Sequence, residues 1–166
     1  MGRCPLNFLS IKPIFIVVLY FRPRSLFVAD FLGESNLLPG KISRVSPDDL
    51  DIIVANRSLP ACATGNGSQF TPGQDVKVMV RPQNLSVSIA GDANSNGNGK
   101  LVGRLTDIMV SGSLTKLYMD AVTPGMPQLI AAYPTRASTR HHAIGELLAL
   151  DWHPADAVAI ADEQAA

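Results

Sequence analysis

Apolar and polar residues alternate most clearly over residues 75–89, DVKVMVRPQNLSVSI. Three valines from Val76 to Val80 take every second position, and after an Arg-Pro pair the alternation resumes between Leu85 and Ile89. A period of two places the apolar side chains on one face of a half-buried strand. Pro82 has no backbone N–H and is therefore expected at a strand end, an edge or a bulge. The stretch predicts two short strands separated by a turn at residues 81–84.

Similar short apolar runs occur on both sides of this stretch, and Gly and Pro residues, 13 and 12 in number, fall between them. That arrangement is typical of many short strands linked by turns. Five strands in about sixty residues, as in the second half of the chain, suit a small closed barrel of the OB type. Trp152, which alternates with Leu148 and Leu150, is expected to face the barrel interior. The predicted strands cover residues 41–45, 50–55, 75–81, 85–89, 101–110, 115–121, 129–133, 147–152 and 158–160.

The N-terminal part of the chain has a different pattern. Over residues 19–35, Pro23 is placed to begin a helix and Gly33 to end it. The sequence thus predicts an all-β fold of OB-like small barrels, built from short antiparallel strands and preceded by one short helix. Its expected parts are an unassigned apolar segment (1–18), the junction helix (19–35), a β domain (36–162) and a tail (163–166). The β domain is expected in two halves, 36–91 and 100–162, joined by a flexible polar linker, 92–99.

Charged residues make up 17% of the chain and the formal net charge is zero. A nucleic-acid-binding domain usually carries a basic patch, and a single-strand binder also needs aromatic stacking platforms. Composition therefore argues against a nucleic-acid partner.

One loop resembles the opening of a calcium-binding loop, with Asp92, Asn94, Asn96 and Gly97 at the right spacing. The twelfth position, which normally supplies a bidentate Glu, is Gly103, and a single carboxylate holds calcium poorly. No metal is expected here.

Histidines could be considered as zinc ligands. His141 and His142 are adjacent, so in a strand they point to opposite faces, and His153 has no cysteine or carboxylate cluster beside it. We interpret them as loop and surface residues. The sequence has no Gly-x-Ser-x-Gly motif and no Walker A loop. No catalytic, cofactor-binding or metal-binding residues are therefore assigned, and the chain is not expected to be an enzyme by itself.

Four segments, in order, resemble one family: FRPRSLFVADFLGESNLLPG (21–40), KVMVRPQNLSVS (77–88), LVGRLTDIMVSGSLTKLYMDA (101–121) and GELLALDWHPADAVAI (145–160). Together they resemble the transport-associated OB (TOBE) domain of ATP-binding subunits of bacterial ABC importers, with the spermidine/putrescine type closest. In that family an Asn, here Asn36, opens the C-terminal domain. Gln83 replaces a Glu of the family pattern and Glu146 replaces an Asp. The nucleotide-binding domain has no counterpart before residue 19.

The resemblance implies an accessory, regulatory and dimerisation domain of such a subunit, here without the ATPase domain. It implies ATP-binding and membrane subunits as partners, and a cytoplasmic location at the inner face of the plasma membrane. It also implies a homodimer, to which barrel faces carrying Met79, Tyr118 and Tyr133 are expected to contribute. The alternative is a free-standing OB module that binds a small ligand such as an oxyanion. Against it, no dense cluster of Ser, Thr and Lys marks an anion site.

Overall fold

The computed structural model describes residues 33–46, 49–63, 70–91, 101–136 and 141–161. In these residues all regular structure is strand, apart from two short 3-10 helices. The expected all-β class is therefore confirmed. No helix in the described part of the chain is long and apolar enough to cross a membrane.

The expected junction helix lies outside the described residues except for its last three positions, 33–35, which are not helical. The N-terminal segment 1–18, the linker 92–99 and the tail 163–166 also lie outside the described residues.

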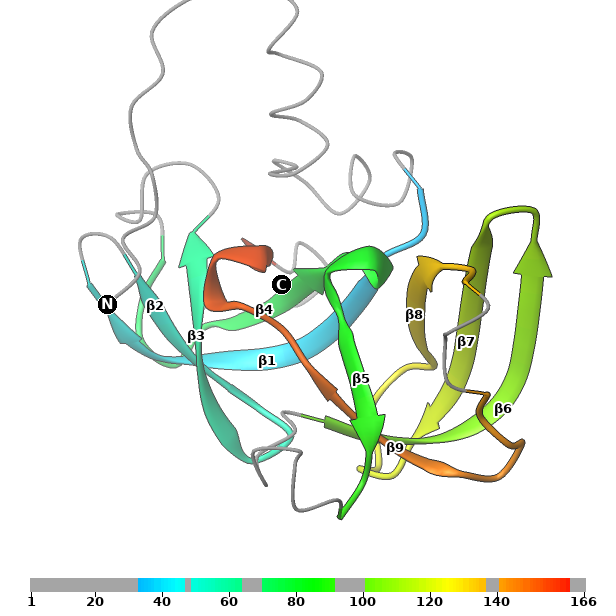
Figure 1. Ribbon diagram of the computed structural model, residues 1–166. Helices are drawn as coiled ribbons and strands as arrows, with labels where there is room; N and C mark the ends of the chain where they lie inside the picture. Colours follow the sequence, from blue (N-terminus) through cyan, green and yellow to red (C-terminus); the bar gives the residue numbers. More distant parts are fainter. Residues whose placement is uncertain (1–32, 47–48, 64–69, 92–100, 137–140, 162–166) are drawn as a thin grey trace, which may run out of the picture.

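The first sheet is a closed five-stranded barrel in the order β1-β2-β3-β10-β4, with β4 pairing back onto β1. All neighbours are antiparallel except β10 and β3, which run parallel. In Figure 1 this barrel occupies the left of the molecule, with β1 running across it toward the second sheet. Its strands are β1 (Asn36–Val45), β2 (Leu50–Val54), β3 (Arg57–Ala63), β4 (Asp75–Val80) and β10 (Ala157–Ala161).

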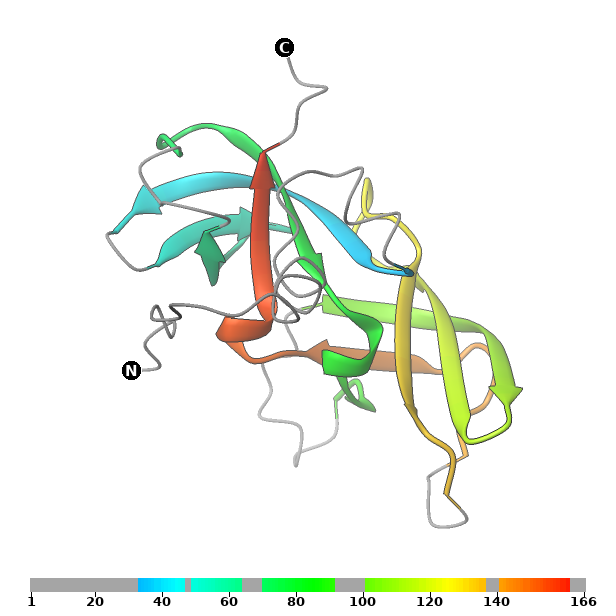
Figure 2. The same ribbon diagram turned by 90° about the horizontal axis from the view of Figure 1, so that it is seen from above.

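The second sheet has five antiparallel strands in the order β5-β9-β6-β7-β8. The sequence predicted a closed barrel from this second group of strands. That detail is wrong, because the barrel that closes is the first sheet. Figures 1 and 2 show the two sheets side by side. The strands are β5 (Ser86–Ile89), β6 (Leu101–Ser111), β7 (Leu114–Ala121), β8 (Leu129–Pro134) and β9 (Leu147–Asp151).

The two sheets exchange strands at their boundary. The chain leaves the barrel after β4 through a 3-10 turn, η2 (Pro82–Asn84), and β5 then joins the second sheet. It returns from β9 through η3 (Pro154–Asp156), and β10 closes the barrel. Each half of the chain thus contributes a strand to the sheet formed mainly by the other half.

Apolar side chains from both sheets form one continuous hydrophobic core. Val76, Val78 and Val80 are buried as their alternation predicts. Trp152 lies one residue beyond β9 and is 4% exposed, and it packs in the core with Leu148 and Leu150. Its expected burial is confirmed, although the strand ends one residue earlier than predicted. A shared core makes the two sheets one cooperative unit.

Candidate functional site

The residues singled out in the sequence as possible metal ligands are placed on different elements. His153 is the N-cap of η3, where its Nδ1 accepts a hydrogen bond from Ala155 N at 3.2 Å. His141 and His142 follow the loop after β8. In the described residues no group of three His, Cys, Asp or Glu side chains is placed to hold a metal ion. The calcium-like loop from Asp92 lies outside the described residues except for its last three positions, 101–103, which belong to β6.

The three residues expected at a pairing surface do not share a face. Met79 is 1% exposed and packs with Val158 and Ile160, so its side chain is not a surface contact. Tyr133 is paired with Thr115 across β7 and β8. Tyr118 is three positions from Thr115 along β7 and therefore points to the opposite face of the sheet from Tyr133.

Two polar networks fix the start of the described chain, residues 33–36, which we call the junction segment. The first is centred on Arg81, at the end of β4, whose side chain is 1% exposed. Its Nη1 donates to Ser35 Oγ at 2.6 Å and to Gly33 O at 3.1 Å. A planar guanidinium suits such a position, because one rigid group reaches several acceptors of a bent backbone.

The second network is made by Asn36, which is 2% exposed at the beginning of β1. Its Nδ2 donates to Ile130 O at 2.8 Å and to Val80 O at 3.2 Å. Its Oδ1 accepts from Ile130 N at 2.7 Å. One amide therefore joins β1 and β4 of the barrel to β8 of the second sheet.

A third contact reaches β7, where Lys116 Nζ donates to a carboxylate oxygen of Glu34 at 2.5 Å. This hydrogen bond raises the pKa of Lys116 above its ordinary value of 10.5, against the opposing effect of burial. The junction segment is thus bonded to both sheets.

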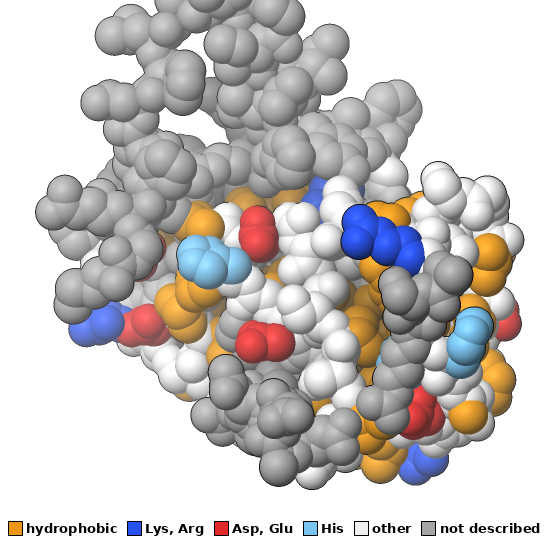
Figure 3. All heavy atoms as spheres, in the orientation of Figure 1, with side chains coloured by type: hydrophobic (Ala, Val, Ile, Leu, Met, Phe, Trp, Pro, Cys, Tyr) orange, Lys and Arg blue, Asp and Glu red, His pale blue; other side chains and the backbone are white. Residues whose placement is uncertain are grey.

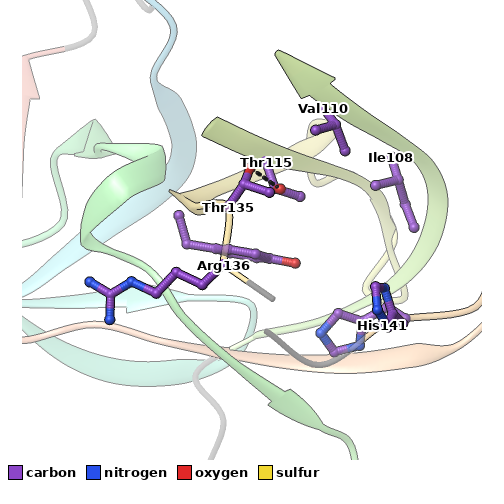
Figure 4. A pocket seen from close by; sticks show the side chains of 8 residues that line it. Ile108, Val110, Thr115, Thr135, Arg136 and His141 are labelled. Atoms are coloured by element: carbon purple, nitrogen blue, oxygen red, sulfur yellow. Dashed lines mark hydrogen bonds between the residues drawn. The ribbon is translucent and has the colours of Figure 1, made fainter. Parts of the chain in front are cut away.

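A small cavity of about 120 Å³ opens at the far end of the second sheet, near the turn between β6 and β7. Ile108 and Val110 of β6 form one wall, and the ring of Tyr133 on β8 lies within it. Figure 4 shows the hydroxyls of Thr115 and Thr135 hydrogen-bonded to each other beside this wall, at 2.7 Å.

The rim of the cavity carries basic side chains. His141 faces the cavity, while the guanidinium of Arg136 is directed away from it (Figure 4). His142 Nδ1 donates to Glu146 Oε2 at 2.9 Å, which fixes the orientation of the imidazole ring. Burial raises the pKa of the Tyr133 hydroxyl, so it remains a neutral hydrogen-bond donor at pH 7. On the face seen in Figure 3, basic and acidic side chains of the described residues are interspersed with apolar ones.

Sequence reasoning noted Asn36 and the Arg81-Pro82 pair without assigning them a contact, and it missed the threonine pair. A signal for Thr115 was present. In β7, Thr115 lies two and four positions before Leu117 and Met119, which are both fully buried. The period of two therefore predicts a hydroxyl on the apolar face of this strand.

Comparison with known proteins agrees with this architecture. Residues 78–160, from within β4 to within β10, match the TOBE domain. The spermidine/putrescine import ATP-binding protein of Pasteurella multocida is 26% identical over 88% of this chain and 39% of its own length. That of Rubrobacter xylanophilus is 28% identical over 81% of this chain and 33% of its own length. That of Pseudomonas fluorescens is 36% identical over 57% and 24%. The chain thus spans between a third and two fifths of the relatives that it matches most extensively.

Among solved structures, the cytoplasmic molybdate-binding protein ModG has a similar fold, with a TM-score of 0.57 at 12% identity. The similarity covers 76% of this chain and 95% of that protein. At this identity it concerns the fold alone. The matched region, half of the chain, includes the whole second sheet and parts of β4 and β10, and on that basis the chain belongs to the TOBE domain family.

Proposed function

We propose that this chain acts as an accessory domain, for regulation and dimerisation, of the ATP-binding subunit of an ABC importer for polyamines or a similar small solute. The observation that carries the proposal is the alignment of more than four fifths of the chain with a third or more of two spermidine/putrescine import ATP-binding proteins. Membership of the TOBE domain family supports it. The partners proposed are the ATP-binding and membrane subunits of the importer, at the cytoplasmic face of the membrane.

The junction segment gives the proposal a mechanical basis. Arg81, Asn36 and Lys116 attach residues 33–36 to the end of the barrel and to two strands of the second sheet. An accessory domain that positions an ATPase must move with it as a rigid body, because a loose tether transmits no orientation. Buried hydrogen bonds from a single Asn and a single Arg to both sheets meet that requirement.

We assign no catalytic step to the chain itself. Binding of ATP phosphates in such subunits requires a glycine-rich loop with a lysine, and hydrolysis requires a magnesium-holding carboxylate. The sequence has no Walker A loop. In the proposed assembly, ATP is bound and hydrolysed by the ATPase domain, and this domain positions that ATPase relative to its partners.

A domain exchange tests the proposal. In the ATP-binding protein of Pasteurella multocida, the part that aligns with this chain is replaced by the chain's own residues from 33 onward. Spermidine uptake is then measured in cells that lack the native subunit. We expect the chimera to restore a substantial fraction of uptake and to sediment as a dimer when purified. A folded, ATP-hydrolysing chimera with no uptake would contradict the accessory role.

Two variants of the chimera sharpen the test. Asn36→Ala removes the three hydrogen bonds of this side chain to β4 and β8, and it should lower uptake while ATP hydrolysis persists. Asn84→Ala, which removes a single bond from η2 to Asp156 Oδ1 (3.2 Å), is the matched control and should leave uptake unchanged. Equal effects of the two changes would contradict the rigid-attachment argument.

A further inference from the structure

We propose that the cavity at the far end of the second sheet binds a small organic anion, a carboxylate carried on a short apolar body. This inference goes beyond the proposed function and does not depend on it, because binding is measured on the chain alone. It rests on the size of the cavity and on the chemistry of its walls.

The size and the inner wall favour a short apolar body. The cavity of about 120 Å³ is somewhat smaller than an apolar cavity of about 150 Å³ that accepts benzene in another protein. Ile108, Val110 and the ring of Tyr133 contribute apolar surface. A tetrahedral inorganic oxyanion needs donors on all sides, and the side chains of Ile108 and Val110 offer none, whereas three or four carbon atoms would cover this apolar surface.

The floor of the cavity between Val110 and Tyr133, where Thr115 lies, favours an anionic head group. In the hydrogen-bonded pair of Thr115 and Thr135, one hydroxyl donates to the other, which leaves one O–H directed by the pair for a ligand. His141 adds an imidazole N–H from the facing loop (Figure 4). A carboxylate accepts such donors in hydrogen bonds stronger than those of neutral acceptors.

The charges around the cavity favour an anion over a cation. Among the described residues that line it there is no Asp or Glu, and Arg136 stands at its rim. The nearby carboxylate of Glu146 is bonded to His142. A polyamine or another organic cation would meet this positive charge with no carboxylate to hold it, so the site is unsuited to such cations.

The experiment uses the full chain and three ligands that share one apolar body: n-butyrate, n-butyramide and n-butylamine. Binding is followed by NMR chemical-shift titration at pH 7 and low ionic strength, so that the interaction is little screened. We expect butyrate to bind with a dissociation constant of about 1–10 mM, a range suited to so small a ligand. The amide and the amine should bind at least tenfold more weakly, and molybdate should neither bind better than butyrate nor displace it.

Variants locate the site. Val110→Trp fills the cavity and Arg136→Gln removes the rim charge, and each should weaken butyrate binding at least fivefold. Arg44→Gln removes an exposed guanidinium from β1 of the barrel and is the matched control for net charge. Thr115→Val removes a hydroxyl without a large change of volume and should weaken butyrate more than butyramide.

Four results would overturn the proposal. The first is the absence of saturable butyrate binding at concentrations up to 100-fold above the expected range. The second is equal binding of butyrate and butyramide, and the third is displacement of butyrate by molybdate. The fourth is an equal effect of Arg136→Gln and Arg44→Gln on butyrate binding.

Discussion

Asn36 offers the sharpest test of how the two sheets are joined. Its side chain is 2% exposed and makes three hydrogen bonds, two with the backbone of Ile130 in β8 and one with Val80 O in β4. The change Asn36→Ala removes all three and leaves the N–H and C=O of Ile130 without this partner. No other protein group moves into the gap unless the sheets shift.

The expected cost follows from the geometry. The bonds of 2.7 and 2.8 Å to Ile130 are well formed, and each contributes about 1 kcal/mol net to stability. The 3.2 Å bond to Val80 O is longer and contributes less. The loss should therefore be about 2–3 kcal/mol, a large part of the 5–15 kcal/mol typical of a whole domain. Asn36→Asp keeps the acceptor for Ile130 N but places a carboxylate oxygen against two carbonyl groups, so it should destabilise at least as much.

The assay is equilibrium unfolding in urea, followed by Trp152 fluorescence and by circular dichroism. Asn84→Ala is the control, because it removes one 3.2 Å bond to Asp156 and should cost at most about 1 kcal/mol. An Asn36→Ala variant within about 0.5 kcal/mol of the parent, or no less stable than Asn84→Ala, would refute the reasoning.

Three further outcomes are expected. Trp152→Ala should lower the unfolding free energy by about 3–5 kcal/mol in urea, since it removes a buried ring from the shared core, and a loss below 1 kcal/mol would contradict its placement. Ala55→Gly should raise the unfolding free energy by about 0.5–1 kcal/mol, because Ala55 has a φ of 50°, which glycine adopts without strain. A lower urea midpoint for this variant would contradict the expectation. Glu34→Gln should destabilise the protein at pH 8 but not well above pH 10.5. Because the pKa of Lys116 is raised in the folded state, the stability gained from its charged form is fully present below pH 10.5. That stability is lost as the pH rises through the folded-state pKa. If the difference in unfolding free energy between Glu34→Gln and the parent is the same at pH 8 and pH 12, the contact between Glu34 and Lys116 does not stabilise the protein.

Period-two alternation predicted most strands because one face of each strand is buried. It failed for β3, Arg57–Ala63, which pairs with β2 and with β10. Pro60 within the strand weakened the pattern. The preceding two-residue turn also lacks the usual glycine, since Ala55 and Asn56 both adopt positive φ, 50° and 63°.

Alternation indicates which face of a strand is buried, but not which strand lies beside it. β5 and β10 were predicted as strands, yet the sequence gives no sign that they join sheets formed by distant segments. The same limit explains Met79, whose position on the outer face of β4 suggested exposure. Val158 and Ile160 from β10 lie beside it and bury it.

The polar networks were beyond sequence reasoning for a related reason. Asn36 and Ile130 are separated by 94 residues, and Arg81 and Ser35 by 46. A lone Asn or Arg at a strand end is ordinary in a sequence. The pairing of β1 with β4 brings Arg81 close to Ser35, and the packing of the two sheets brings Ile130 of β8 to Asn36.

The two sites of the second sheet share the strands that connect them. On β7, Thr115 lines the cavity and the next residue, Lys116, contacts Glu34 of the junction segment. On β8, Tyr133 lines the cavity three residues after Ile130, the partner of Asn36. A ligand that repositions the Thr115 hydroxyl therefore acts on strands that hold the junction segment, with no flexible loop between. Such coupling is reciprocal, so a force on the junction segment that shifts β7 and β8 also changes ligand affinity. In the assembly proposed above, this short path would connect an anion in the cavity with the attached ATPase.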